Sequence, residues 1–188
     1  MSRILIQYNK SIMRRCVMIC VIMGVAGSGK STIGRMLAQK FAIAFHDADD
    51  YHPEANKEKM KSCIPLDDQD RLPWLSELAT NIVEWNQSKG AVLACSALKE
   101  KYRQILSQDG KEDVIFIYLK GNMTIIVDRM KARKEHFFSL ELLESQFNTL
   151  EEPQNAFTVQ IDKTPEEICT EIVDQLINRG LVAFAKRK

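Results

Sequence analysis

Residues 24–31 read GVAGSGKS, which has the form G-x-x-x-x-G-K-S of a phosphate-binding loop. The apolar run of residues 17–23 leads into this loop and is typical of a buried parallel strand. Residues 31–41 follow, with apolar side chains at helical spacing. A strand, a glycine loop and a helix in this order are the context in which the motif binds phosphate.

The residue types of the loop suit the phosphates of a nucleotide. Glycines let successive backbone N–H groups point into one concavity, and the N-terminus of the next helix adds its positive end. The Lys30 ammonium can reach the β- and γ-phosphates, and the Ser31 hydroxyl can bind Mg²⁺. A plain glycine turn would not need a Lys-Ser pair after it. We therefore predict binding of ATP and Mg²⁺, with nucleotide contacts from Gly24, Val25, Ala26, Gly27, Ser28, Gly29, Lys30, Ser31 and Thr32.

Composition limits the classes of protein to which the chain can belong. At 188 residues, 45% hydrophobic and 27% charged, it is predicted to fold as one globular domain. A net charge of +1 argues against a broad nucleic-acid or membrane surface. The longest apolar run falls well short of the roughly 20 residues that span a bilayer. Five scattered cysteines without zinc-site spacing favour reduced thiols and a cytoplasmic protein.

The order of patterns along the chain predicts an α/β fold. Residues 1–16 are expected to be a poorly ordered extension, and residues 17–188 a single domain. The N-terminal part imitates a secretory signal, but cleavage there would destroy the phosphate loop. Thr164 to Glu167 form a capping box that opens the last helix. Helical stretches separate the apolar runs, which predicts a five-stranded parallel sheet flanked by helices, with further strands at 42–45, 91–95, 114–119 and 157–161.

Acidic residues follow the second predicted strand rather than the third or fourth. Asp47 and Asp49 come at its end, beside the phosphate loop, because ligands bind at the carboxyl ends of parallel strands. Asp47 is predicted to hold the metal, and Asp49 to orient an acceptor hydroxyl and take its proton. A solvated acidic turn is the structural alternative, and Asp50 is assigned to it.

Seven further segments of the chain form a family pattern, namely DADDYHP (47–53), NKEKM (56–60), PLDDQDRLPWL (65–75), CSALK (95–99), HFF (136–138), SQF (145–147) and LE (150–151). In these segments the chain resembles the gluconokinases, a group of shikimate-kinase-like small-molecule kinases. The resemblance implies a P-loop kinase fold with a substrate-binding helical part at about 50–88, a mobile lid at about 129–140, and a homodimer. The family usually has glycine where this chain has Cys63 and Glu135, which affects a turn and the lid.

The family reaction moves the γ-phosphoryl of ATP to the 6-hydroxyl of D-gluconate, giving 6-phosphogluconate and ADP and feeding the pentose phosphate pathway. An acceptor with one carboxylate and five hydroxyls needs a cation and several short polar groups. Arg71 suits bidentate binding of the carboxylate. Asp49 is the candidate general base by this resemblance. The predicted substrate-binding residues are Asp49, His52, Asn56, Lys59, Arg71, His136 and Gln146.

The basic segment 129–136 follows the fourth strand and its helix. By resemblance to related kinases, Arg129 would stack on adenine and Arg133 would reach the transferring phosphate as a built-in arginine finger. Catalysis is thus assigned to Lys30, Asp49 and Arg133. A charge run on a helix is otherwise a solvated face.

Several alternatives stay open at this point. A kinase of the same fold with another acceptor, such as shikimate, would favour a Gly-Gly-Gly turn where this chain has residues 95–97. A non-catalytic nucleotide-binding sensor of a sugar acid would be expected to lose Lys30, Ser31, Asp47 or Asp49. Lys99 and Tyr102 either face the substrate or lie on an exposed helix face.

Overall fold

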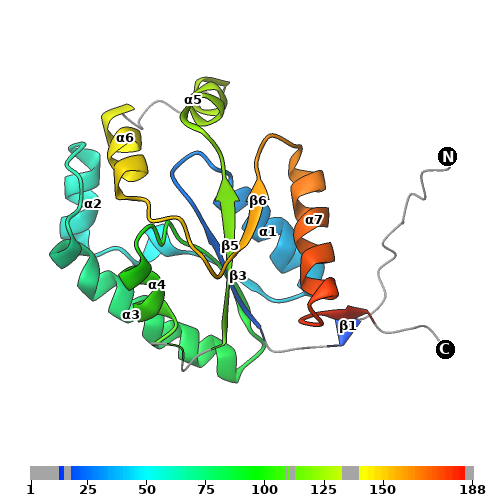
Figure 1. The fold of residues 1–188 in the computed structure, drawn as a ribbon. Coiled ribbons are helices and arrows are strands. Elements are labelled where there is room, and N and C mark those ends of the chain that lie inside the picture. Colours follow the sequence, from blue (N-terminus) through cyan, green and yellow to red (C-terminus); the bar gives the residue numbers. More distant parts are fainter. Residues whose placement is uncertain (1–12, 15–17, 109, 111–112, 133–139, 185–188) are drawn as a thin grey trace.

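The computed structural model describes residues 13–14, 18–108, 110, 113–132 and 140–184. Within these residues a parallel sheet has the strand order β3-β4-β2-β5-β6, so the strand that leads into the phosphate loop lies at its centre (Figure 1). This confirms the predicted parallel α/β sheet. Its strands are β2 (Ile19–Met23), β3 (Ala44–Asp47), β4 (Ala91–Ala94), β5 (Val114–Lys120) and β6 (Phe157–Gln160).

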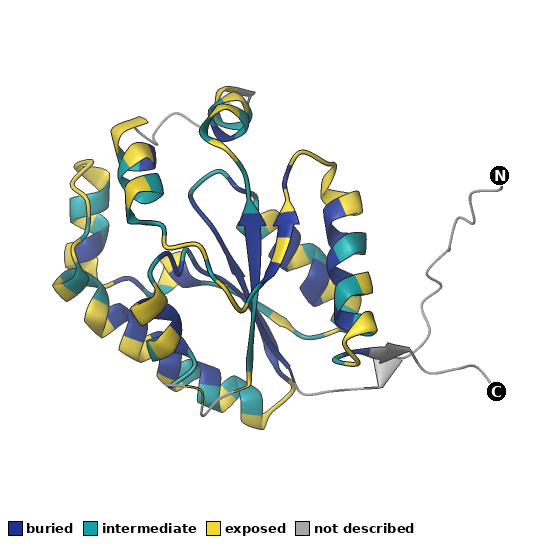
Figure 2. Ribbon diagram, in the orientation of Figure 1, coloured by how far each residue is buried: buried dark blue, intermediate teal, exposed yellow. Residues whose placement is uncertain are grey.

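Helices cover both faces of the sheet, which explains why the central strand is apolar throughout. Every residue of β2 is buried, and Figure 2 shows buried residues along the middle of the sheet. Cys20 and Ile22 pack toward one pair of helices, and Ile19, Val21 and Met23 join the core on the other face. The first pair is α1 (Lys30–Phe41) and α7 (Pro165–Asn178), and the second is α3 (Asp68–Gln87) and α4 (Glu100–Leu106).

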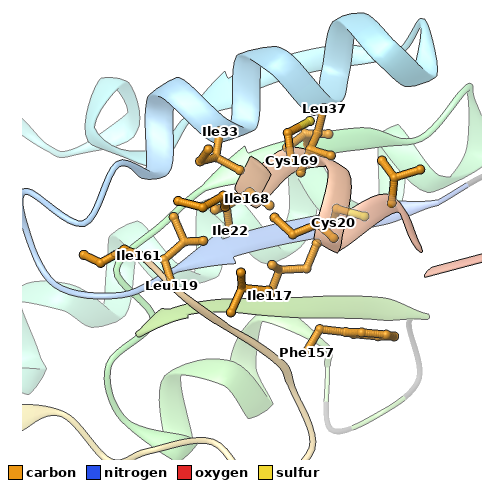
Figure 3. Close-up of a cluster of buried hydrophobic side chains, with 14 of the residues drawn as sticks. Cys20, Ile22, Ile33, Leu37, Ile117, Leu119, Phe157, Ile161, Ile168 and Cys169 are labelled. Atoms are coloured by element: carbon orange, nitrogen blue, oxygen red, sulfur yellow. The ribbon is translucent and has the colours of Figure 1, made fainter. Parts of the chain in front are cut away.

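The core between the sheet and the first helix pair is continuous. Ile33 and Leu37 of α1 meet Cys20 and Ile22 of β2, and Ile168 of the neighbouring α7 belongs to the same cluster (Figure 3). The helical spacing that predicted α1 is therefore the spacing of its buried face. The capping box of α7 is present, with Pro165 as its first residue.

The first predicted boundary after α1 is shifted in the structure. The sequence pattern placed a strand at 42–45, but β3 begins only at Ala44. Ala42 instead has φ +54° and closes α1 with its backbone N–H. A left-handed residue cannot continue an extended strand, so the strand starts two residues later.

The remaining helices lie at the carboxyl end of the sheet, toward which β5 points in Figure 1. This is the end at which ligands bind in open parallel sheets. These elements are the 3₁₀ helix η1 (Ala48–Tyr51), α2 (Glu54–Lys61), α5 (Met123–Ala132) and α6 (Leu140–Thr149).

A small two-stranded sheet was not anticipated from the sequence. β1 (Met13–Arg14) pairs antiparallel with β7 (Ala183–Phe184), with Met13 opposite Phe184. The rest of the predicted extension at 1–16 lies outside the described residues. Across the part of the chain that is described, no helix is both long and apolar enough to cross a membrane.

Candidate active site

The phosphate loop connects β2 to α1 and is shaped by glycines. Gly24 has φ +137°, and a Cβ there would lie 2.9 Å from the Leu119 carbonyl oxygen. Gly29 precedes α1 with φ +100° and makes no side-chain cap, which leaves the helix N-terminus to a ligand. Side chains at either position would be strained or would clash. The glycines therefore give the loop backbone conformations that other residues would adopt only with strain.

Lys30, Ser31 and Asp47 meet at the base of this loop. The Lys30 Nζ donates to the Val25 carbonyl at 3.0 Å, and the Ser31 hydroxyl donates to Asp47 Oδ2 at 2.7 Å. Desolvation lowers the pKa of Lys30, while the nearby Asp49 carboxylate opposes that shift. The other Asp47 oxygen accepts the Asp49 N–H at 3.3 Å, so its carboxylate is held from two sides.

The hydroxyl–carboxylate pair fits a magnesium ion. Mg²⁺ binds through one or two protein oxygens and completes its shell with waters and substrate phosphates. The described residues contain no group of three or more His, Cys, Asp or Glu side chains placed to hold a metal. Ser31 and Asp47 are thus of the right chemistry for Mg²⁺ bound together with a nucleotide, rather than for an ion caged by protein alone.

Asp47 ends β3, and Asp49 lies two residues later on η1, where it faces an open cavity. Its side chain is 85% exposed to the solvent of that cavity. Desolvation by the surrounding protein nevertheless raises the pKa of its carboxyl, the Lys30 ammonium counteracts this, and the carboxylates of Asp47 and Asp50 add to it. A carboxylate with a raised pKa beside the phosphate loop can accept a proton from an acceptor hydroxyl.

A single cavity of about 720 Å³ joins the phosphate loop to the helices at the carboxyl end of the sheet. Its lining includes residues from η1, α2, α3 and α6. The volume is that of a small-molecule site. Six of the residues predicted from the sequence line it, namely Ala26, Lys30, Asp49, His52, Arg71 and Gln146.

His52 forms part of the cavity wall and is only 6% exposed. Its ring stacks on Trp74 with 4.2 Å between centroids, and the Asn56 amide nitrogen lies 3.3 Å from its Nδ1. Because that nitrogen donates, Nδ1 accepts and the ring proton lies on Nε2, which is 4.0 Å from Asp49 Oδ1. Burial, with smaller contributions from Arg71 and Lys57, lowers the pKa of His52 to about 4. His52 is therefore neutral at pH 7 and offers an N–H beside Asp49.

Arg71 enters the cavity from the first turns of α3. Its Nε and Nη2 donate to the Leu66 carbonyl at 3.3 and 3.2 Å. Its guanidinium carbon lies 5.6 Å from the centroid of the Tyr102 ring. These contacts fix the orientation of the guanidinium, which can pair with a carboxylate through two parallel hydrogen bonds.

Asp68 lies one helical turn before Arg71 on α3. Its carboxylate accepts hydrogen bonds from three residues at the start of α4. Lys99 Nζ donates to it at 2.9 Å and Lys101 Nζ at 2.5 Å, and the Tyr102 hydroxyl also donates to it. These hydrogen bonds hold the pKa of the Asp68 carboxyl well below its usual range. The sequence left the roles of Lys99 and Tyr102 open. In the structure both bind Asp68, and the Tyr102 ring held in this way lies beside the Arg71 guanidinium.

Two predicted substrate ligands are placed outside the lining of the cavity. The Asn56 amide nitrogen donates to the Asp70 carbonyl at 2.8 Å, besides its contact with His52. Lys59 Nζ forms an ion pair with the Asp70 carboxylate, with nitrogen–oxygen distances of 2.6 and 2.8 Å. Asp70 is also the N3 residue of the α3 capping box, which begins at Asp67. Asn56 and Lys59 therefore join α2 to the start of α3 and support the wall that carries His52.

Gln146 contacts the phosphate loop directly. It lies on α6, and its side-chain Oε1 accepts the Ala26 N–H at 2.7 Å. The sequence predicted a hydroxyl ligand at this position but gave no sign of a contact with the loop.

Arg129, near the end of α5, bridges the phosphate loop and the turn after β6. Its Nη1 donates to the Ser28 carbonyl at 3.5 Å, and its Nη2 donates to the carbonyls of Ile161 and, at 3.3 Å, Lys163. These hydrogen bonds lie in the plane of the guanidinium, so they are compatible with an aromatic base stacked on its face.

Comparison with known proteins agrees with this geometry. A profile of the shikimate kinase family matches residues 26–177. The chain is 44% identical over 173 residues to a probable gluconokinase of Dictyostelium discoideum, covering 85% of this chain and 86% of that protein. It is 41% identical over 167 residues to the thermoresistant gluconokinase of Escherichia coli K12, covering 86% and 94%. A crystal structure of a gluconokinase from Sinorhizobium meliloti 1021 has a TM-score of 0.81 at 34% identity, covering 88% and 95%. This chain belongs to the gluconokinase family.

Gluconokinase membership confirms the predicted resemblance and the class of ATP-dependent kinase. It leaves the predicted lid roles untested, because Arg133 and His136 lie outside the described residues. Glu135, where the family was expected to have glycine, lies there as well. Their assignments to phosphate and substrate stay predictions.

Cys63 is the other position at which the family was expected to have glycine, and it lies within the described residues. Its backbone has φ +56°, in the turn that follows α2. Glycine adopts this left-handed conformation without cost, whereas a residue with a Cβ does not. Cys63 is exposed and lines the cavity. A residue with a Cβ therefore stands in a strained turn at the edge of the candidate site.

Other residues that line the cavity were missed by sequence reasoning. Lys57 and Lys61 of α2 add two cations to the lining, and Ser96 and Ser145 add hydroxyls. The two lysines are four positions apart on one helix and so share a face, which was a signal available in the sequence. Ser96 follows β4 at the carboxyl end of the sheet, where ligands bind. Nothing in the sequence marked Ser145 as a cavity residue, except that it precedes Gln146.

Proposed function

We propose that this protein transfers the γ-phosphoryl group of ATP to the 6-hydroxyl of D-gluconate, giving 6-phosphogluconate and ADP. The observation that carries the proposal is the single cavity that joins Lys30 and Ala26 to Asp49 and to Arg71. It combines a phosphate loop, a candidate base and a cation suited to a carboxylate. The names of the relatives, which are gluconokinases, support the same acceptor.

Each end of the acceptor has a candidate partner in this cavity. The carboxylate would bind Arg71, with Lys57 and Lys61 adding positive charge to the same lining. The hydroxyls would bind short polar groups, including the Nε2–H of neutral His52. The reacting 6-hydroxyl, at the far end of the acceptor from its carboxylate, would lie between Asp49 and the phosphate loop.

The chemical step needs little beyond positioning and charge neutralisation. The acceptor oxygen forms a bond to the γ-phosphorus while the bond from that phosphorus to the β–γ bridging oxygen breaks, and the hydroxyl proton passes to the Asp49 carboxylate. Lys30 neutralises charge on the transferring group. Mg²⁺, held by Ser31 and Asp47, would neutralise the β- and γ-phosphates when bound. Arg129 would stack on adenine, and Arg133 would contact the transferring phosphoryl.

The test is ADP release from Mg·ATP with D-gluconate, shikimate, AMP, D-glucose or no acceptor. Stimulation by gluconate but not by glucose, which lacks the carboxylate, is expected. Activity with shikimate or AMP instead would replace the acceptor and keep the kinase class. Nucleotide binding with no turnover on any acceptor would favour the sugar-acid sensor.

A further inference from the structure

The contact between Gln146 and Ala26 joins two parts of the chain that are 120 positions apart. The Ala26 N–H belongs to the phosphate loop, and the Gln146 side chain comes from α6, one of the helices at the carboxyl end of the sheet (Figure 1). Both residues line the cavity together with Lys30 and Asp49. The contact therefore lies inside the candidate active site and not behind it.

The Gln146 oxygen accepts an N–H of the loop whose backbone N–H groups are expected to bind phosphate. Such loops bind phosphate through backbone N–H groups that point into one concavity. One N–H makes one short hydrogen bond at a time, and the 2.7 Å distance from Ala26 N to Gln146 Oε1 is that of a short bond. A phosphoryl oxygen and the Gln146 amide oxygen would compete for this N–H. Lys30, whose Nζ lies 3.0 Å from the Val25 carbonyl, likewise has a protein acceptor that phosphate would replace.

We propose that Gln146 is a displaceable occupant of the phosphate site that couples nucleotide binding to acceptor binding. Without nucleotide, its amide oxygen holds the Ala26 N–H. The terminal phosphoryl group of the nucleotide takes this N–H and releases the amide into the cavity. There the amide binds a hydroxyl of the acceptor, so that Gln146 is a positioning residue for both substrates in turn. The second half of the exchange rests on the proposed sugar-acid acceptor, whereas the first half does not.

Nucleotide binding should favour acceptor binding, because the released Gln146 amide needs a new hydrogen-bond partner. A polar side chain that loses a hydrogen bond inside a cavity is destabilised unless another group replaces the bond. An acceptor hydroxyl can both donate and accept, and so it can satisfy either atom of the amide. Nucleotide should therefore raise the affinity for the acceptor, and by thermodynamic reciprocity the acceptor should raise the affinity for nucleotide by the same factor.

The first arm of the test measures nucleotide alone. Binding of a non-hydrolysable Mg·ATP analogue to the full chain is measured by calorimetry for the wild type, Gln146→Ala and Gln146→Glu. Alanine removes the competing oxygen, so the dissociation constant should fall roughly three- to tenfold, the worth of one hydrogen bond. Glutamate keeps the contact with the Ala26 N–H and adds a charge that repels phosphate, so the dissociation constant should rise. Unchanged or weaker binding by Gln146→Ala would overturn the proposal.

Asn148→Ala is the matched control, because it removes the same amide group from an exposed position of the same helix. Its nucleotide affinity should equal that of the wild type. Opposite effects of alanine and glutamate at position 146 cannot come from a general loss of structure, which would weaken binding in both. Thermal unfolding of each variant provides the check on folding.

The second arm measures D-gluconate binding with and without the analogue. In the wild type the analogue should tighten gluconate binding roughly three- to tenfold, and in Gln146→Ala this ratio should be close to one. Equal ratios in the two proteins would overturn the coupling. If gluconate does not bind at all, the proposed acceptor is wrong, while the nucleotide arm still decides whether Gln146 competes with phosphate.

Discussion

The two sides of the cavity are built by different means. The phosphate side, residues 24–31 with Asp47, is a continuous backbone loop whose shape comes from glycines. The acceptor side, formed by α2, α3, α6 and His52 at the end of η1, is a set of side chains held by other side chains, such as His52 by Trp74 and Arg71 by Tyr102. Asp49 stands between them. A backbone cradle recognises any phosphate group, whereas a wall of supported side chains can select one acceptor.

The largest effect is expected on the phosphate side. Lys30→Ala removes the cation beside the transferring group, and turnover should fall at least about a thousandfold. The fold should survive, because the Lys30 Nζ donates to a single backbone carbonyl. Steady-state ADP release measures the loss, with the exposed Lys89→Ala as control. If both variants were equally active, Lys30 would have no part in the reaction.

Asp49→Asn should have the next largest effect, because it removes the proton acceptor at the boundary of the two sides. We expect kcat to fall about a hundredfold or more, with the nucleotide affinity little changed. Asp50→Asn changes the adjacent exposed carboxylate and is the matched control. Normal turnover in Asp49→Asn would remove this residue from the mechanism.

The folded protein should lose stability in acid because of His52, which lies on the acceptor side of the cavity. Its pKa is about 4 in the folded protein and 6.5 in the unfolded chain. The unfolded chain therefore binds the proton first as pH falls, so the contribution of neutral His52 is complete above pH 6.5 and is lost toward pH 4. The free energy of unfolding should lose up to about 1.4 kcal/mol per pH unit in this window. Urea denaturation at pH 7, 6 and 5 tests this, and His52→Gln should flatten the dependence. An unchanged slope in the variant would contradict the assignment.

Asp68→Asn tests whether the acceptor side depends on supporting residues. It weakens the hydrogen bonds that place Tyr102 beneath Arg71, so KM for gluconate should rise roughly five- to tenfold. The value of kcat and the KM for ATP should change little. Tyr102→Phe keeps the ring and loses only its hydroxyl, and so should show a smaller increase. A matching fall in kcat would mean that the network serves the chemical step.

The smallest effect is expected at Cys63. Cys63→Gly relieves the left-handed strain but makes the unfolded chain more flexible, so we expect a net stabilisation of about 0.5 kcal/mol. Cys63→Ala keeps the Cβ and should show no gain. Urea denaturation of both variants measures the difference, and equal stabilities would show that the turn is not strained by its Cβ.

The same contrast explains how far the sequence could predict the molecule. The phosphate loop, the sheet and α7 were predictable because glycine positions, apolar runs and a capping box are local signals. The partners of Asp68 and Asp70, and the contact of Gln146 with Ala26, join separate elements and depend on how the helices pack. Lys59 shows the limit, because its residue type suited a substrate ligand but its neighbour in space is Asp70. The pairing of β1 with β7 involves too few residues to leave a pattern.

That pairing has a practical consequence. Because Met13 lies opposite Phe184, the two ends of the described chain run side by side, and Figure 1 shows them away from α5 and α6. A short peptide could join them and new termini could be opened elsewhere, which would give a circular permutant with its active site intact. A surface tether placed at this point would likewise leave the cavity open to solution.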